Sequence, residues 1–256
     1  MRTLLTWVLF ACLFATGASA AEVLRAAYED KAEPPFYMGD TSEVPGSPGV
    51  SVELVREAAA ELGIEVQFQR MPWVRCLKSL QRGEVDLTFN ASFKEERLEF
   101  GVYPTVDGKL DPSRRITTLT YALYRLKGSH IAWDGTKISG LDGPVGIQSG
   151  YSVKEDLTRL GVPTEEASDT QVNFKKLTSK RIPAVAQLEV TADTLLARGD
   201  FPSVEKVTPA LVKKDYFVIV SHQFYEAKRE LAEKLWTKVG ELRETRLTAL
   251  HAKYAR

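Results

Sequence analysis

The chain has very little cysteine. Cys12 and Cys76 are the only two among 256 residues. Cys12 lies in an N-terminal apolar segment, so the rest of the chain has one thiol, which cannot form an internal disulfide. The fold must therefore rest on its hydrophobic core rather than on covalent cross-links. Roughly 235 residues follow that segment, which is enough for one large domain or for two lobes with cores of their own.

An excess of one charge is also missing, since 34 Lys and Arg stand against 34 Asp and Glu. No basic run interleaved with aromatic residues occurs, and we therefore expect no nucleic-acid partner. HExxH, GxSxG, Walker and CxxC patterns are absent too. The three histidines, His130, His222 and His251, are not arranged as an acid–base group would be. We expect no catalysis, no metal and no cofactor.

The one long apolar run stands at the N-terminus, in "MRTLLTWVLFACLFATGASA". Arg2 precedes it, and Ala18, Ser19 and Ala20 form a small-x-small cleavage pattern. These features predict a secretory signal peptide at residues 1–20 and a mature chain from Ala21. A membrane anchor is disfavoured because the run falls short of the ~20 residues that span a bilayer. Lipidation at Cys12 stays an alternative.

Strand-like and helix-like patterns alternate along the rest of the chain. Ser51 is expected to cap one helix and Gly63 to end it. The segment 105–118 breaks the alternation and is expected to be an irregular connection or a hinge-side insertion. Such alternation indicates an α/β protein with largely parallel sheets. The expected strands are 23–28, 66–71, 85–90, 143–150, 181–187 and 216–221, and the expected helices are 51–63, 72–83, 151–161, 188–199 and the segment from about Phe224.

The order of these pieces resembles a known family. "ELG", "EVQFQ", "LQRGEVDLTF" and "SFKEERLEFGVYP" follow one another, and "GLDGPVGIQSGYSVKEDL" and "RIPAVAQLEVTADTLL" come later. The chain resembles family 3 periplasmic solute-binding proteins of the polar amino-acid type. The resemblance implies the type II periplasmic binding protein fold, an α/β fold of two lobes. Lobe 1 would comprise residues 21–120 and 217–256, and lobe 2 residues 121–216, with hinge crossovers near 121–123 and 216–219.

The resemblance also implies a function. It predicts a non-catalytic, monomeric periplasmic protein that captures a small polar carboxylate-bearing solute between its lobes. An inner-membrane ABC permease would receive that solute. A sensing module that signals to a membrane receptor is the first alternative. A dehydratase-like enzyme on the same fold is the second.

Arg97 stands where the family carries the arginine that grips a substrate carboxylate. A guanidinium matches a carboxylate with two parallel hydrogen bonds. The competing interpretation is a solvated charge on a helical turn. Ser92 and Asn90 follow the preceding strand and supply polar groups, and Asp30 follows the first strand. Arg75 lies in the first turn of its helix and is included as a second cation.

Tyr151 and Ser152 occupy the turn into a lobe 2 helix, where free N–H groups attract an anion. Ser152 could equally serve only as a helix cap. The family's acidic residue in this lobe falls on Leu188, and a shift of one residue would bring in Glu189 instead. The sequence therefore does not predict that the ligand is an α-amino acid.

Four other residues are considered as part of the cleft or of the core. Glu33 replaces an aromatic residue on which the family's ligands stack. Tyr28 and Phe36 form either a cleft wall or part of the core, and Trp73 is expected in the core.

Overall fold

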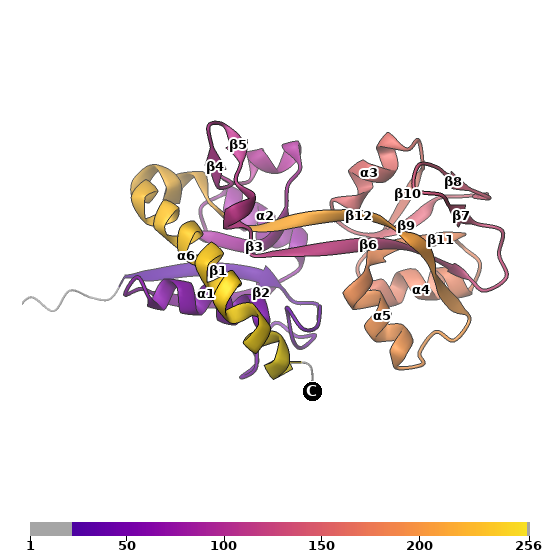
Figure 1. Cartoon of the computed structure of the whole chain (residues 1–256), viewed down its shortest axis with the longest axis horizontal. Helices are drawn as coiled ribbons and strands as arrows, with labels where there is room; N and C mark the ends of the chain where they lie inside the picture. The colour runs from indigo at the N-terminus through magenta and orange to yellow at the C-terminus, as the bar shows by residue number, and fades with distance from the viewer. Residues whose placement is uncertain (1–21, 255–256) are drawn as a thin grey trace, which may run out of the picture.

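The computed structural model describes residues 22–254. The predicted signal peptide and Cys12 lie outside this range. Two lobes are joined by two long strands that run side by side (Figure 1). One eight-stranded sheet runs through both lobes in the order β10-β9-β11-β6-β12-β3-β1-β2. Among the described helices, none is both long enough and apolar enough to cross a membrane.

Lobe 1 is built around the β1, β2 and β3 end of this sheet. Strands β1 and β2 are parallel, and so are β1 and β3. Strand β3 is buried along its whole length, although three of its six residues, Thr88, Asn90 and Ser92, are polar. Helix α6 lies against α1 (Figure 1). The elements are β1 (Val23–Glu29), α1 (Val50–Ala60), β2 (Glu65–Met71), α2 (Trp73–Gln81), β3 (Leu87–Ser92), the 3-10 helix η1 (Glu95–Glu99) and α6 (His222–Tyr254).

Lobe 2 is built around β9, β10 and β11. The sequence pattern missed β10 and α4, because β10 is short and polar and Asp169, which caps α4, starts a segment with a weak apolar stripe. A small hairpin of β7 (Ala132–Trp133) and β8 (Ile138–Ser139) flanks the lobe. The elements are β9 (Val145–Gln148), α3 (Val153–Arg159), β10 (Thr164–Ala167), α4 (Thr170–Thr178), β11 (Ala184–Leu188) and α5 (Glu189–Ala197).

The two connecting strands are β6 (Thr117–Leu126) and β12 (Val204–Val220), which pair antiparallel. The predicted crossovers fall within them. The register shifts between Val207 and Val212, so the ribbon is irregular where it passes through lobe 2. Sequence alone indicated only the apolar end of β12, because half of residues 204–215 in this strand are polar and most of them are partly or fully exposed. The lobe boundaries at 120/121 and 216/217 stay a prediction.

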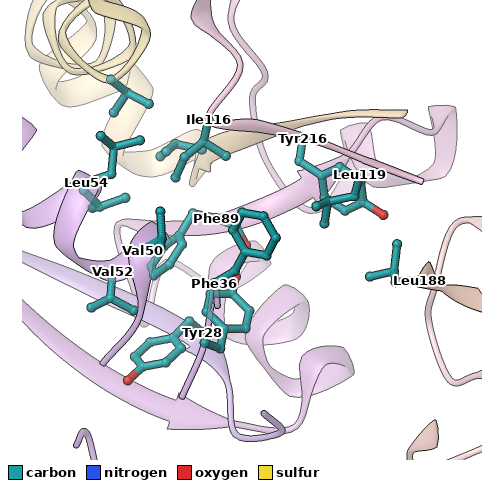
Figure 2. Packing of buried hydrophobic residues seen from close by; sticks show 14 of the residues in the cluster. Tyr28, Phe36, Val50, Val52, Leu54, Phe89, Ile116, Leu119, Leu188 and Tyr216 are labelled. Carbon is teal, nitrogen blue, oxygen red and sulfur yellow. The ribbon is translucent and has the colours of Figure 1, made fainter. Parts of the chain in front are cut away.

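The core of lobe 1 resolves the alternatives for two aromatic residues. Tyr28 is fully buried and stacks on Phe89, with ring centroids 5.6 Å apart. Phe36 packs edge-on against His251 of α6. Figure 2 shows Tyr28, Phe36 and Phe89 in one cluster. Both Tyr28 and Phe36 therefore belong to the core.

Two local predictions were wrong. Gly49, not Ser51, is the N-cap of α1, and Ser51 lies inside the helix, where its hydroxyl donates to Asn90 Oδ1 at 3.0 Å. The segment 105–118 is not an irregular connection. It forms the hairpin β4 (Thr105–Val106) and β5 (Lys109–Leu110), followed by a 3-10 turn, η2 (Pro112–Arg114). Arg243 of α6 donates to the Ser113 carbonyl at 3.1 Å, which fixes this turn to lobe 1.

Candidate functional site

A small pocket lies between the lobes, where the carboxyl ends of β1, β3 and β11 meet. In an α/β sheet this edge is the usual place for a ligand site. Its volume is about 20 Å³, which is close to what one water molecule needs. The lobes are thus drawn together over it. Its lining includes Glu29, Glu33, Trp73, Asn90, Ser92 and Arg97 from lobe 1, Tyr151 and Leu188 from lobe 2, and Tyr121 and Tyr216 from the connecting strands.

Arg97 is at the centre of this pocket. Its side chain is 2 % exposed, which excludes the interpretation as a solvated charge. Nη1 donates to the Ser92 carbonyl at 2.6 Å, and Nη2 donates across the cleft to the Gly150 carbonyl at 2.9 Å. The guanidinium lies over the Trp73 ring at 5.2 Å. Among the described residues, nothing accepts a hydrogen bond from the buried Nε.

Strand β3 delivers Asn90 and Ser92 to the same pocket. Asn90 has φ 53°, a left-handed conformation that non-glycine residues rarely adopt. The β3–β12 register shifts beside it, between Phe217 and Ile219. The Asn90 amide nitrogen is buried with no acceptor among the described residues. Strained and unsatisfied polar groups of this kind concentrate at binding sites.

The lobe 2 turn after β9 closes the pocket. Ser152 is fully buried and makes no side-chain cap bond to α3. Its hydroxyl is instead 2.7 Å from the Ser92 hydroxyl of lobe 1. Gly150 has φ +77°, and a Cβ placed there would lie 3.0 Å from Val74 Cγ2. This turn therefore touches lobe 1 through its backbone and its small side chains.

Glu29 joins the two lobes at the end of β1. Its Oε1 accepts from Gln148 Nε2 at 2.7 Å, and its Oε2 accepts from the Tyr151 hydroxyl at 2.8 Å. Burial raises the pKa of Glu29 to about 7, although both hydrogen bonds lower it. Tyr151 also borders a second pocket of about 250 Å³, which Lys31, Thr170 and Arg198 help to line. The Glu29–Tyr151 contact thus lies beside both pockets.

Glu33 is the second buried acid of the pocket. It is 4 % exposed, and its Oε1 finds no partner within residues 22–254. Burial and the nearby Glu29 raise the pKa of Glu33 well above its usual value. No group of three or more His, Cys, Asp or Glu side chains in the described part of the chain could hold a metal ion.

Sequence comparison decides the family. Residues 24–256 match the profile of the bacterial extracellular solute-binding proteins, family 3. The chain belongs to this family. No curated protein sequence matches it significantly.

Solved structures share the family fold. A histidine kinase sensor domain similar to periplasmic binding proteins is 18 % identical, with a TM-score of 0.73 over 91 % of this chain and 96 % of that one. The GluR0 ligand-binding core from Nostoc punctiforme, in complex with L-glutamate, is 19 % identical, with a TM-score of 0.67 over 90 % and 98 %. The substrate-binding protein of an amino acid ABC transporter is 16 % identical, with a TM-score of 0.67 over 91 % and 98 %. The predicted family and the two-lobed α/β fold are confirmed.

Within this family 3 protein, three predicted site residues lie away from the pocket lining. Arg75 is exposed on α2. Glu189 opens α5 and faces Lys206 at 3.6 Å, whereas Leu188 is the residue that lines the pocket. Asp30 directly follows Glu29, but its backbone N–H is bonded to Met71 and its side chain is not part of the lining.

Sequence reasoning missed other lining residues. Trp73 was expected in the core, and it is both buried and stacked on Arg97. Tyr121 and Tyr216 bond each other through their hydroxyls at 3.1 Å. Their position on the predicted crossovers could have indicated them, because a ligand in the cleft lies beside the strands that connect the lobes. Sequence reasoning did not select Glu29 as a binding residue, because a buried strand end gives no sign of partners in the other lobe.

Proposed function

We propose that this protein captures a small polar solute bearing a carboxylate and presents it to an inner-membrane ABC permease from the periplasm. The observation that carries the proposal is Arg97, a buried cation between the lobes whose Nε has no acceptor among the described residues. Family membership supports an extracellular or periplasmic setting. We expect the protein to act as a monomer.

A ligand carboxylate would complete the Arg97 site. Charge-assisted hydrogen bonds from a guanidinium strengthen when water is excluded. Asn90 Nδ2 and the hydroxyls of Ser92 and Ser152 supply further polar groups beside it. The pocket is too small for an amino acid in this arrangement, so the lobes must separate to admit one. Hinge closure around the solute would then mark the loaded form for the membrane partner.

Two other functions have an observation in their favour. The likeness to a histidine kinase sensor domain favours a sensing module that signals to a membrane receptor. Glu29, with a pKa of about 7, has the property of a general acid, which favours a dehydratase-like enzyme. Binding ranks first because Glu29 is held by two lobe 2 donors.

Isothermal titration calorimetry against amino acids and organic acids tests the proposal. We expect at least one carboxylate-bearing compound to bind. Arg97→Lys should weaken that binding about 10- to 100-fold, since lysine keeps the charge but loses the planar fork. Arg82→Lys is the matched control, because Arg82 is an exposed lobe 1 arginine.

The outcomes separate the alternatives. Equal affinity of wild type and Arg97→Lys would show that Arg97 is not the anchor. Binding of no carboxylate at all would overturn the proposed ligand class. Consumption of prephenate-like substrates, followed by absorbance, would replace binding with catalysis.

A further inference from the structure

The larger pocket between the lobes lies beside the Glu29–Tyr151 contact and is separate from the one that contains Arg97. Its volume is about 250 Å³, against about 20 Å³ for the Arg97 pocket. Among the described lining residues, Tyr151 alone borders both. One water molecule takes up roughly 30 Å³ in the liquid. The larger pocket, called here the Lys31–Arg198 pocket, therefore has room for a small solute of its own.

Each lobe contributes one cation to this pocket. Lys31 lies in the loop that follows β1 of lobe 1, and Arg198 directly follows α5 of lobe 2. Within residues 22–254, neither side chain forms an ion pair or donates a hydrogen bond. The two like charges therefore border one pocket from opposite lobes without a bonded counter-charge.

The two acids of the lining are already engaged with backbone groups. Asp40 Oδ1 accepts from Ala32 N at 2.9 Å. Asp169 caps α4, and its Oδ1 accepts from Val172 N at 2.8 Å. In the described part of the chain, neither acid is paired with Lys31 or Arg198. The charged groups still open to a solute are thus cations, which favours an anion as the occupant.

Polar side chains of lobe 2 add to this preference. Gln171 of α4 and Thr191 of α5 border the pocket, and their side chains make no hydrogen bond to another described residue. Both can donate, through an amide N–H and a hydroxyl. Hydrogen bonds from cations to an oxyanion are stronger than those between neutral groups. An occupant with several anionic oxygens would therefore satisfy the two cations and both neutral donors.

We propose that the Lys31–Arg198 pocket is a second solute site, which binds a small, multiply charged oxyanion between the lobes. Phosphate is the simplest member of this class. Such an anion would contact Lys31 of lobe 1 and Arg198 of lobe 2 together, and so hold the lobes closed. The site is separate from the Arg97 pocket, and the inference does not depend on the proposed function.

Isothermal titration calorimetry with inorganic phosphate tests the inference. The titration is made at about pH 8, where phosphate is mostly a dianion, and at constant ionic strength. Wild type should bind phosphate. Lys31→Gln and Arg198→Gln should each weaken this binding about 3- to 10-fold, because each removes one charged contact that is partly open to water. The double variant should lose more than about tenfold in affinity.

Two exposed residues outside the pocket provide matched controls. Lys78→Gln in lobe 1 and Arg159→Gln in lobe 2 remove the same charge as the test variants. Both should bind phosphate as wild type does. If they weaken binding as much as Lys31→Gln and Arg198→Gln do, the effect is one of net charge and the inference is wrong.

Two further outcomes would overturn the inference. The first is that wild type does not bind phosphate, which leaves the proposed function standing. The second is that Arg97→Lys weakens phosphate binding while Arg198→Gln does not, because the anion would then lie in the Arg97 pocket. Failure of every carboxylate to bind wild type would instead overturn the proposed function and leave this inference standing.

Discussion

The two walls of the interlobe pocket differ in kind. The lobe 1 wall carries all three charged residues of the described lining, Glu29, Glu33 and Arg97. The lobe 2 wall presents Leu188, the Tyr151 hydroxyl and the Gly150 carbonyl, which are neutral. Charge recognition and closure are therefore divided between the lobes. On the proposed function, lobe 1 would hold the ion while the cleft is open, and lobe 2 would then remove water from it.

This division has an energetic consequence. The neutral wall of lobe 2 buries the two acids of lobe 1 and gives Glu29 hydrogen bonds but no counter-charge. The acids therefore resist ionisation in the closed arrangement. If the lobes separate, as the proposed function requires, both carboxyls would regain water. Closure would then be coupled to proton uptake.

The largest expected effect is a pH dependence through Glu29. Its pKa is about 7 in this structure against an ordinary 4.5, so between these values the closed, folded protein binds more protons than the opened or unfolded chain. The free energy of unfolding of the protein therefore falls as pH rises from about 4.5 to about 7. The full shift in the pKa of Glu29 corresponds to a loss on the order of 3 kcal/mol. Glu33 acts in the same direction.

Thermal unfolding between pH 5 and pH 8 measures this effect. Glu29→Gln should flatten the curve, since glutamine cannot ionise. His251 has a lowered pKa and opposes the trend, so the comparison uses the difference between variant and wild type. If the curves of stability against pH are parallel for wild type and Glu29→Gln, the pKa of Glu29 is not raised in solution, because its carboxylate stays hydrated or paired.

A smaller effect is expected where lobe 2 touches lobe 1 through glycine. In Gly150→Ala the new Cβ would lie 3.0 Å from Val74 Cγ2 and 3.2 Å from Trp73 Cδ1. Crowding of this kind costs about 1–3 kcal/mol, and here it opposes closure. We expect binding of a ligand found by calorimetry to weaken about tenfold.

Gly161→Ala separates closure from backbone strain. Gly161 also has a left-handed φ, +71°, but a Cβ there would meet nothing within 4 Å. Both variants should lose similar thermal stability, because an alanine in this conformation costs about 1–2 kcal/mol. Only Gly150→Ala should lose affinity. If both lose it equally, the contact with α2 does not limit closure.

The hydroxyl pair between the lobes should matter less. Ser152→Ala removes the 2.7 Å contact with Ser92, and a neutral hydrogen bond contributes about 0.5–1.5 kcal/mol. The dissociation constant should rise about 2- to 10-fold. Ser149→Ala is the control, since the Ser149 hydroxyl bonds Ala167 within lobe 2. Equal losses of affinity in Ser152→Ala and Ser149→Ala would show that the hydrogen bond between Ser92 and Ser152 has no specific role in binding.

Much of the fold could be predicted because apolar periodicity records burial. It located β1, β2, β3, α1 and α2 to within a few residues. Strand β10 and helix α4 escaped because their sequences are largely polar. Most of β12 escaped because a strand that bridges two lobes alternates weakly between solvent and core.

Only part of the candidate site could be predicted from the sequence. The family order placed Arg97, Ser92 and Asn90 on the lobe 1 wall, and Tyr151 and Ser152 opposite. Local patterns could not show that Glu29 pairs with Gln148, because the two lie 119 positions apart. Partners of that kind depend on how the lobes meet, which no local periodicity records.

The smallest expected effect belongs to Arg75. Two helical positions separate it from Trp73, which is about 200° around the helix. A helix that presents Trp73 to the pocket must therefore present Arg75 to solvent, where it lies. Arg75→Ala should change affinity by less than about twofold in calorimetry, as exposed substitutions usually do. A tenfold loss would mean that α2 turns during binding, and the charged wall would then hold a second cation after all.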